Sequence, residues 1–275
     1  MTRAWSDPVG PYRADQIREG EPYELSRGHR IDCMTAGGRH GTAHLVGSSV
    51  LNSDPGLAHA PAIDVGIEWN EGKNLRAPDI IAGIDVNTPG WARQAPPLAI
   101  EFADAGQDEA QLRLKIAELL EFGTRLIWVV RLTGPLRVEI HEPGQPIRVV
   151  HGDGDLHAPG ILQNPVPVRA LIDRDAALDA TLRNLLNREG YPNLAAVREE
   201  GREEGREEGR EEGREEGRET ALTTARERLY AQLNARGWSL APFLSDRIAA
   251  CTDLSVLLGW LMATVTAESA EAALR

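Results

Sequence analysis

The amino-acid sequence predicts an α/β chain: an α+β core with a mixed sheet, a charged helical arm, and a small helical C-terminal module. Three observations support this prediction. Residues 1–175 alternate short apolar runs with turn signals, which is typical of strands joined to a few helices. Residues 176–220 are helical in character and then become a low-complexity repeat. Residues 221–275 place apolar side chains at helical spacing.

The first part contains a series of short candidate strands separated by turn signals, such as EGKN and Pro78. The run PLAIEFA is rich in aliphatic residues, so we expect it near the centre of the sheet. GTAHLVGSSVLNS, at 41–53, is predicted to be a helix. The predicted strands are a pair within 23–34, then 62–69, 79–86, 97–103, 125–132, 137–142 and 147–151.

A helix is expected directly after the strand at 97–103. Asp104 can cap its first turn, and Gln107, three positions later, would complete a capping box. Gly123 is well placed to end the helix. Its apolar stripe consists of Leu112, Ile116, Leu119 and Leu120.

The segment from Arg198 to Glu219 repeats REEG every four residues. On a helix this period stacks like charges at i,i+4, whereas Glu199 over Arg202 and its repeats at i,i+3 offset the repulsion. Each Gly costs roughly 1 kcal/mol relative to Ala, and no apolar stripe anchors the segment to a core. We interpret it as a solvated, marginally helical spacer, with a protein-binding arm as the alternative.

Beyond the repeat, residues 221–275 predict three short amphipathic helices. Gly237 and Pro242 mark the first break, and Thr252 or Asp253 is expected to cap the next helix. Such a unit is too small for a large core of its own. We therefore expect it to pair with itself or to pack on a protein partner.

Composition places the chain among ordinary globular proteins, with 41% hydrophobic and 26% charged residues. No apolar run is long enough to cross a bilayer, and the N-terminus lacks the apolar core of a signal peptide. We therefore predict a cytoplasmic protein without membrane contact. Cys33 and Cys251 lie too far apart for a disulfide framework or a metal cluster, and we expect both to be small core residues.

The net charge of -12 excludes tight, sequence-independent DNA binding of the histone kind. The repeat, with 6 Arg and 11 Glu, contributes -5 of this charge, and the rest of the chain contributes -7. A carboxylate site that uses a divalent cation remains compatible with this acidity, because the metal supplies local positive charge.

Three residues form a candidate catalytic set. RAPDII places Asp79 at the start of a strand, LAIEFA carries Glu101 near the end of another, and Lys115 follows on the next helix. Two carboxylates at strand ends can hold a hard divalent ion such as Mg²⁺. The ion can polarise a phosphodiester and lower the pKa of a bound water. A nearby ammonium can orient that water or offset charge in the transition state.

The choice of lysine supports this interpretation. The chain has 28 Arg but only two Lys, so a Lys at position 115 indicates a chemical requirement. Lys73 lies in the turn EGKN, where a surface role is enough. Each candidate also has an ordinary structural alternative. Asp79 fits a common turn, Glu101 a solvated strand position, and Lys115 a helix surface.

Taken together, RAPDII, LAIEFA and K-x7-G-x4-W resemble the Uma-type restriction-endonuclease family, a branch of the PD-(D/E)XK nuclease superfamily. The resemblance covers roughly residues 20–175 and includes YELSRG. It implies that Asp79 and Glu101 bind Mg²⁺, with Mn²⁺ as a substitute, and that the catalytic lysine is Lys115. The usual superfamily position of the lysine is Ala103, whose backbone carbonyl is implied as a further metal ligand.

The chain departs from the family pattern at two positions. Asp104 stands where the family commonly has serine, and Leu119 where it commonly has tyrosine. Glu24 matches a frequent family glutamate, and we assign it a supporting role. The C-terminal third resembles the tails of transposon-associated nucleases, which favours self-association or docking. The matching residues there are Arg236, Gly237, Arg247, Ile248 and Trp260.

These observations favour a metal-dependent DNA endonuclease, with water as nucleophile. We expect a homodimer, because one such site cuts one strand. Two alternatives stay open. The fold could serve as a catalytically weak or inactive binding or regulatory module that acts through its helical C-terminal region. The same chemistry also suits another phosphoester hydrolase, such as a phosphatase. The acidity favours the module, and the intact Asp, Glu and Lys set favours the endonuclease.

Overall fold

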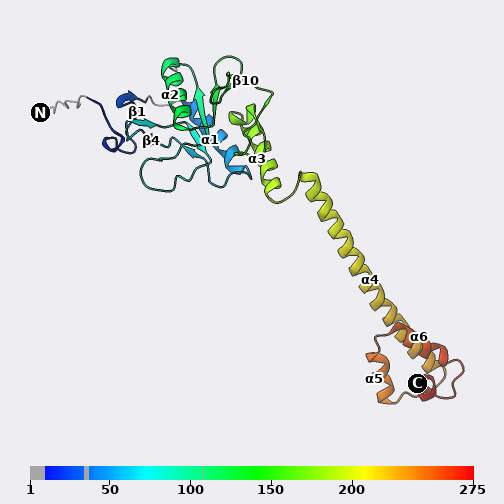
Figure 1. The fold of residues 1–275 in the computed structure, drawn as a ribbon. Helices are drawn as coiled ribbons and strands as arrows, with labels where there is room; N and C mark the ends of the chain where they lie inside the picture. The colour runs from blue at the N-terminus through cyan, green and yellow to red at the C-terminus, as the bar shows by residue number, and fades with distance from the viewer. Residues whose placement is uncertain (1–9, 34–36, 107) are drawn as a thin grey trace. The chain divides into compact units, whose positions relative to one another are not determined.

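Figure 1 shows the chain in a computed structural model, which describes residues 10–33, 37–106 and 108–275. The chain divides into two compact units, Met1–Leu194 and Ala195–Arg275. Among the described residues, no helix combines the length and the apolar character that crossing a membrane requires.

A six-stranded mixed sheet forms the centre of the first unit, in the order β10-β9-β8-β7-β6-β3. β7 and β8 are parallel, and the other neighbouring pairs are antiparallel. Every residue of β7 is buried, which confirms that this aliphatic strand is central. The strands are β3 (Ala62–Ile63), β6 (Ile80–Ala82), β7 (Leu98–Ala103), β8 (Leu126–Arg131), β9 (Arg137–His141) and β10 (Arg148–His151).

Helices cover both faces of this sheet. Successive side chains of a strand point to opposite faces, so a strand of apolar residues has an apolar surface on each face. Phe102 packs in the core with α1 and α3, whereas Ala103 packs on the opposite face with α2. Glu101 lies two residues before Ala103 on the strand and therefore points to the same face, toward α2. The helices are α1 (Gly38–Ser53), α2 (Glu109–Phe122) and α3 (Arg174–Arg188).

A smaller four-stranded sheet has the order β2-β1-β5-β4 and packs on a small core that contains Leu25 and Leu75. Its antiparallel β1–β2 pair is the one predicted within 23–34. Residue 34, the last of that range, lies outside the described residues. The remaining elements are β1 (Tyr23–Ser26), β2 (His29–Asp32), β4 (Ile67–Trp69), β5 (Asn74–Arg76), β11 (Asp155–Leu156), β12 (Val166–Pro167) and the 3-10 turns η1 (Ala14–Gln16) and η2 (Val168–Leu171).

Three predicted elements differ in the structure. The strand expected at 79–86 is shortened to β6, and Gly83 after it has a left-handed φ of 93°. The strand expected at 62–69 is broken into β3 and β4, which belong to different sheets, and Asp64 between them adopts a left-handed φ of 54°. α2 begins after Asp108, whose side chain accepts the N–H groups of Ala110 and Gln111. Asp104 therefore does not cap it, and Gln107 lies outside the described residues.

The end of α2 is as predicted. Gly123 is its C-cap, with a φ of 123° that favours glycine. Asp104, freed from the capping role, pairs instead with Arg39 of α1. The prediction of two core cysteines was wrong, since Cys33 is exposed and Cys251 is half-buried.

The first unit extends beyond residue 175. α3 begins there, and its buried Ala177 and Ala180 belong to the core beneath α1. The unit ends at Leu194 instead, where α4 begins. Because α3 contributes to the sheet core, it is part of the fold that positions the site.

The second unit begins with a helix of 42 residues, α4. The REEG repeat lies within it and is exposed throughout, with Glu199 paired to Arg202 at 2.7 Å. After the break at Gly237, shorter helices pack on the end of α4, and Asp253 caps α6 as predicted. The helices are α4 (Leu194–Ala235), α5 (Pro242–Ala250), α6 (Leu254–Ala263) and α7 (Ala270–Ala273).

Candidate functional site

Asp79 lies directly before β6, beside the C-terminal half of β7. Its Oδ2 accepts a hydrogen bond of 2.6 Å from the backbone N–H of Phe102. Burial acts to raise the pKa of Asp79. The imidazoles of His40 and His44 outweigh burial, together with the ammonium of Lys115, and hold this pKa well below its ordinary value. Asp79 is therefore an anion at neutral pH.

Glu101 is 5% exposed and faces α2 from the middle of β7. Its Oε1 lies 2.8 Å from Nζ of Lys115, which α2 contributes. Burial raises the pKa of Glu101 to about 8, although Lys115 opposes this shift, and the Asp79 carboxylate adds to the increase. The single ammonium thus does not supply enough positive charge to keep Glu101 fully ionised.

Lys115 is held by three oxygen atoms. Besides contacting Glu101, Nζ donates a hydrogen bond of 2.8 Å to the carbonyl of Ala77 and lies 3.2 Å from Oε1 of Glu24. Burial would lower the pKa of Lys115, but the surrounding carboxylates raise it above its ordinary value. Lys115 therefore remains protonated. The structure brings the three sequence-predicted residues, Asp79, Glu101 and Lys115, into one cluster.

Glu24 and Arg76 form a buried layer behind this cluster. Arg76 is 1% exposed and donates to Glu24 Oε2 at 2.8 Å and to Glu118 Oε2 at 2.6 Å. Burial acts to raise the pKa of Glu24, but Lys115 and Arg76 hold it below its ordinary value. Ser26 donates to the second oxygen of Glu118. This layer fixes Glu24, which in turn helps to fix Lys115.

The donor set fits a hard divalent cation. Glu101 and Glu24 contact Lys115, and the charge of Asp79 also acts on it. Arg76 is already shared between Glu24 and Glu118. The cluster therefore holds more carboxylates than cations, and this adds to the burial that raises the pKa of Glu101. A cation beside Asp79 and Glu101 would supply the missing charge, and carboxylate oxygens are the ligands that Mg²⁺ prefers.

The backbone carbonyl of Ala103 does not fit the role of metal ligand that the resemblance implied. It accepts a hydrogen bond of 2.9 Å from the N–H of Leu132 and so points toward β8. The N–H and carbonyl of a strand residue point to the same side, and this side alternates along the strand. The carbonyl of Phe102 therefore points toward Asp79, where the N–H of Phe102 already bonds. A metal ligand from the backbone of this strand stays a prediction.

Sequence reasoning missed two histidines beside Asp79. Nε2 of His40 and Nε2 of His44 each lie 3.4 Å from Asp79 Oδ2, and the two ring centroids are 4.4 Å apart. The H-x3-H spacing in HGTAH places both rings on one face of α1. That spacing was the available signal. The sequence could not tell which neighbour this face of the helix would meet.

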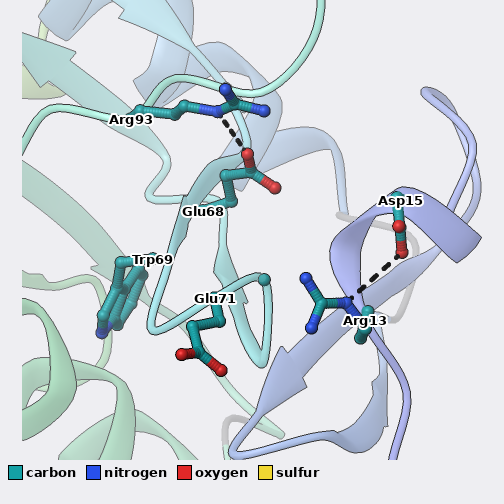
Figure 2. Close-up of a pocket in the computed structure, with 7 residues that line it drawn as sticks. Arg13, Asp15, Glu68, Trp69, Glu71 and Arg93 are labelled. Atoms are coloured by element: carbon teal, nitrogen blue, oxygen red, sulfur yellow. Dashed lines mark hydrogen bonds and ion pairs between the residues drawn. The ribbon is translucent and has the colours of Figure 1, made fainter.

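A surface pocket of about 430 Å³ lies apart from this cluster, and Figure 2 shows its lining. Its charged groups are already paired, because Arg93 contacts Glu68 at 2.5 Å and Arg13 contacts Asp15 at 3.9 Å. None of the predicted catalytic residues lines it. The lining residues are Arg13, Asp15, Glu68, Trp69, Glu71, Gly72 and Arg93.

Comparison with solved structures identifies the class of fold. The chain is similar to a crystal structure described as a putative nuclease belonging to DUF820 from Anabaena variabilis. The TM-score is 0.52 and the sequence identity 20%, and the match covers 62% of this chain and 99% of that chain. The chain therefore shares the fold of that protein over 62% of its length.

Comparison with protein families identifies the family. Residues 12–166 match Uma2, described as "Putative restriction endonuclease". The match spans more than half of the chain, so the chain belongs to the Uma2 family. The comparison with curated proteins gave no match. The family match ends before α3, and the resemblance of the C-terminal tail to transposon-associated nucleases stays a prediction.

Proposed function

We propose that this chain is a metal-dependent DNA endonuclease that hydrolyses phosphodiester bonds. The observation that carries the proposal is the buried cluster of Asp79, Glu101 and Lys115, in which Nζ of Lys115 lies 2.8 Å from Glu101. Membership of the Uma2 family supports DNA as the substrate. The proposed cofactor is Mg²⁺, with Mn²⁺ as a substitute, because the cluster offers carboxylate oxygens. The cytoplasmic location stays a prediction.

The residues divide the chemistry between them. A bound Mg²⁺ would polarise the scissile phosphodiester and lower the pKa of a water ligand. Asp79, an anion at neutral pH, and Glu101 would hold the ion. Lys115 remains protonated beside Glu101. Its ammonium is suited to orient the attacking water or to stabilise charge on the phosphate in the transition state.

The proposal is tested by cleavage of supercoiled plasmid and single-stranded DNA with Mg²⁺ or Mn²⁺. We expect Asp79→Asn and Lys115→Ala each to lower the nicking rate by about 100-fold or more, the scale of losing one transition-state contact. Lys73→Ala is the matched control, because Lys73 is the other lysine of the chain and pairs on the surface with Glu71 at 3.6 Å. Chelation of the metal should abolish nicking by the wild type.

Loss of nicking in both variants, with Lys73→Ala unaffected, would assign the activity to the cluster. Nicking that is equal in all four proteins would come from a contaminant and would contradict the proposal. Melting temperatures of the variants show whether a lost activity reflects a lost fold, because Asp79 and Lys115 are both largely buried.

A second candidate is a catalytically weak or inactive nuclease-fold module that binds or regulates through its C-terminal region. The net charge of -12 favours it, since this acidity opposes DNA binding. Absence of nicking by the folded wild type with either metal would favour this module. The C-terminal unit would then be the first place to seek a protein partner.

A further inference from the structure

Two imidazoles from one turn of α1 and one carboxylate from the segment before β6 converge on a common point. His40, His44 and Asp79 each offer one ligand atom, and these atoms lie within 4.8 Å of one another. Both imidazole Nε2 atoms are 3.4 Å from the same Asp79 oxygen. The i,i+4 spacing on α1 and the position of Asp79 before β6 produce this convergence, because α1 packs on the face of the sheet that includes Phe102.

These separations suit a shared ion better than direct hydrogen bonds. A good N–H···O bond spans about 2.7–3.2 Å, which is shorter than 3.4 Å. Nε2 of His44 is accordingly a buried polar atom without a hydrogen-bond partner among the described residues. Ligand bonds of about 2.1 Å in a tetrahedral site would separate neighbouring ligand atoms by about 3.4 Å. Both histidine–Asp79 distances correspond to that value, and the ligand atoms of the two histidines lie within 4.8 Å of each other.

The surroundings orient the imidazoles toward this point. His44 is 8% exposed, and its ring lies 5.4 Å from that of Phe102. On the other side of the same ring, Nδ1 of His44 faces Asp64 Oδ1 at 4.0 Å. At this distance Asp64 does not hydrogen-bond the ring, but its negative charge lies behind it, as carboxylates do behind many ligand imidazoles. Nε2 faces Asp79 on the other side and is available as a metal ligand.

We propose that His40, His44 and Asp79 form a binding site for a divalent first-row transition ion, of the zinc class. Imidazole nitrogen favours Zn²⁺, Co²⁺ and similar ions, whereas Mg²⁺ prefers oxygen alone. The site shares Asp79 with the proposed Mg²⁺ position but draws its other ligands from α1. Its existence does not depend on nuclease activity, and binding can therefore be measured separately.

The test is titration of the full chain with Zn²⁺ by calorimetry and with Co²⁺ by visible absorption. We expect one equivalent of Zn²⁺ to bind to the wild type and to Glu101→Gln. His40→Ala and His44→Gln should each weaken binding by at least about 100-fold, since loss of an outer partner alone costs about 10–100-fold in other metal sites. His151→Ala is the matched control, because His151 is an exposed histidine on β10.

A second measurement avoids variants that fail to fold. In ¹H–¹⁵N spectra of the wild-type imidazoles, Zn²⁺ should shift two of the seven histidines strongly. Assignment of these two to His40 and His44 supports the site. Unshifted His40 and His44 signals, or binding unchanged in both histidine variants, would overturn it. Zn²⁺ binding without Mg²⁺-dependent nicking would support this site and contradict the proposed nuclease. Nicking without Zn²⁺ binding would support the nuclease and contradict this site.

Discussion

Glu101 is the residue at which burial and charge conflict most directly. It is 5% exposed, and Lys115 is its nearest cation. Burial nevertheless raises its pKa to about 8. In the folded, metal-free protein Glu101 thus holds a proton that an unfolded glutamate would have released near its ordinary value of 4.5. A bound divalent cation would reverse this preference, so metal binding should release a proton.

This conflict predicts a pH dependence of stability. Between pH 4.5 and about 8 the folded state binds more protons than the unfolded state, so the free energy of unfolding falls as pH rises. The slope for one proton is at most about 1.4 kcal/mol per pH unit. His40, whose pKa is raised mainly by the neighbouring Asp79 carboxylate, adds a slope of the same sign above pH 6.5.

Urea denaturation in a chelator, from pH 5.5 to 8.5, measures this dependence. Glu101→Gln cannot titrate and should flatten the curve, leaving the smaller contribution of His40. Glu121→Gln is the matched control, because Glu121 is exposed on α2 and should keep the wild-type slope. Parallel curves for wild type and Glu101→Gln would show that Glu101 is ionised across this range.

Substitution of Arg76 tests how much the buried layer behind the cluster contributes to stability. Removing one partner of a buried ion pair leaves an uncompensated charge and typically costs about 3–5 kcal/mol. We expect Arg76→Ala to lower the free energy of unfolding by that amount, since both Glu24 and Glu118 would lose their guanidinium. Arg93→Ala, whose side chain is 83% exposed, should cost less than about 1 kcal/mol. Similar losses in the two variants, measured by chemical denaturation, would argue against a special role for the buried layer.

At the scale of elements, the apolar pattern predicted the positions of the strands well. Capping signals predicted the start of α2 less well. β7 was predictable because a run of aliphatic residues suits a strand buried on both faces. The end of α2 was predictable because Gly123 accepts a left-handed φ. The start of α2 was not, since Asp104 and Asp108 are both competent caps. The choice between them depends on Arg39, which reaches Asp104 from α1.

The two aspartates give a direct test of where α2 begins. Asp108→Ala removes the cap that accepts two backbone N–H groups and should cost about 1 kcal/mol of unfolding free energy. Asp104→Ala removes a contact to an Arg39 side chain that is 64% exposed and should cost less. Thermal denaturation of both variants measures the difference. A larger loss for Asp104→Ala would contradict the helix start seen in the structure.

The same scale explains why part of the site was predictable. Asp79, Glu101 and Lys115 belong to neighbouring elements of one supersecondary unit, and the family resemblance assigned their roles. His40 and His44 come from α1, nearly 40 residues earlier in the chain. Their approach to Asp79 depends on how α1 packs over the sheet, which helical periodicity does not fix. The carbonyl direction at Ala103 likewise depends on the register between β7 and β8.

At the scale of the whole molecule, the family match and the C-terminal unit concern different parts of the chain. The match ends at residue 166, whereas the second unit begins at Ala195. Ile248 and Trp260, which carry the resemblance to transposon-associated nucleases, are core residues of the second unit. Arg247 lies over the ring of Trp260 at 5.0 Å. These residues thus stabilise the unit, and any docking must use its exposed side chains.

An exposed apolar stripe on α6 is the best candidate for such docking. Leu258 and Met262 are 45% and 76% exposed, and their i,i+4 spacing places them on one side of α6. Val265, which is 65% exposed, follows shortly after the helix ends at Ala263. Met262 and Val265 also line a hollow of about 640 Å³ with the last turns of α4. An exposed apolar hollow of this kind is typical of contact sites, and the homodimer expected from the sequence could use it.

We therefore expect Met262→Glu to shift the full chain from dimer toward monomer, because a carboxylate in an apolar contact loses its hydration without gaining a partner. Light scattering over a concentration series measures the shift. Leu45→Glu is the matched control, since Leu45 is 69% exposed on α1 in the first unit. Dissociation by Leu45→Glu alone would place the contact on the nuclease-like unit. Dissociation by Met262→Glu alone would place it on the second unit, and a wild type that is monomeric throughout would contradict the homodimer.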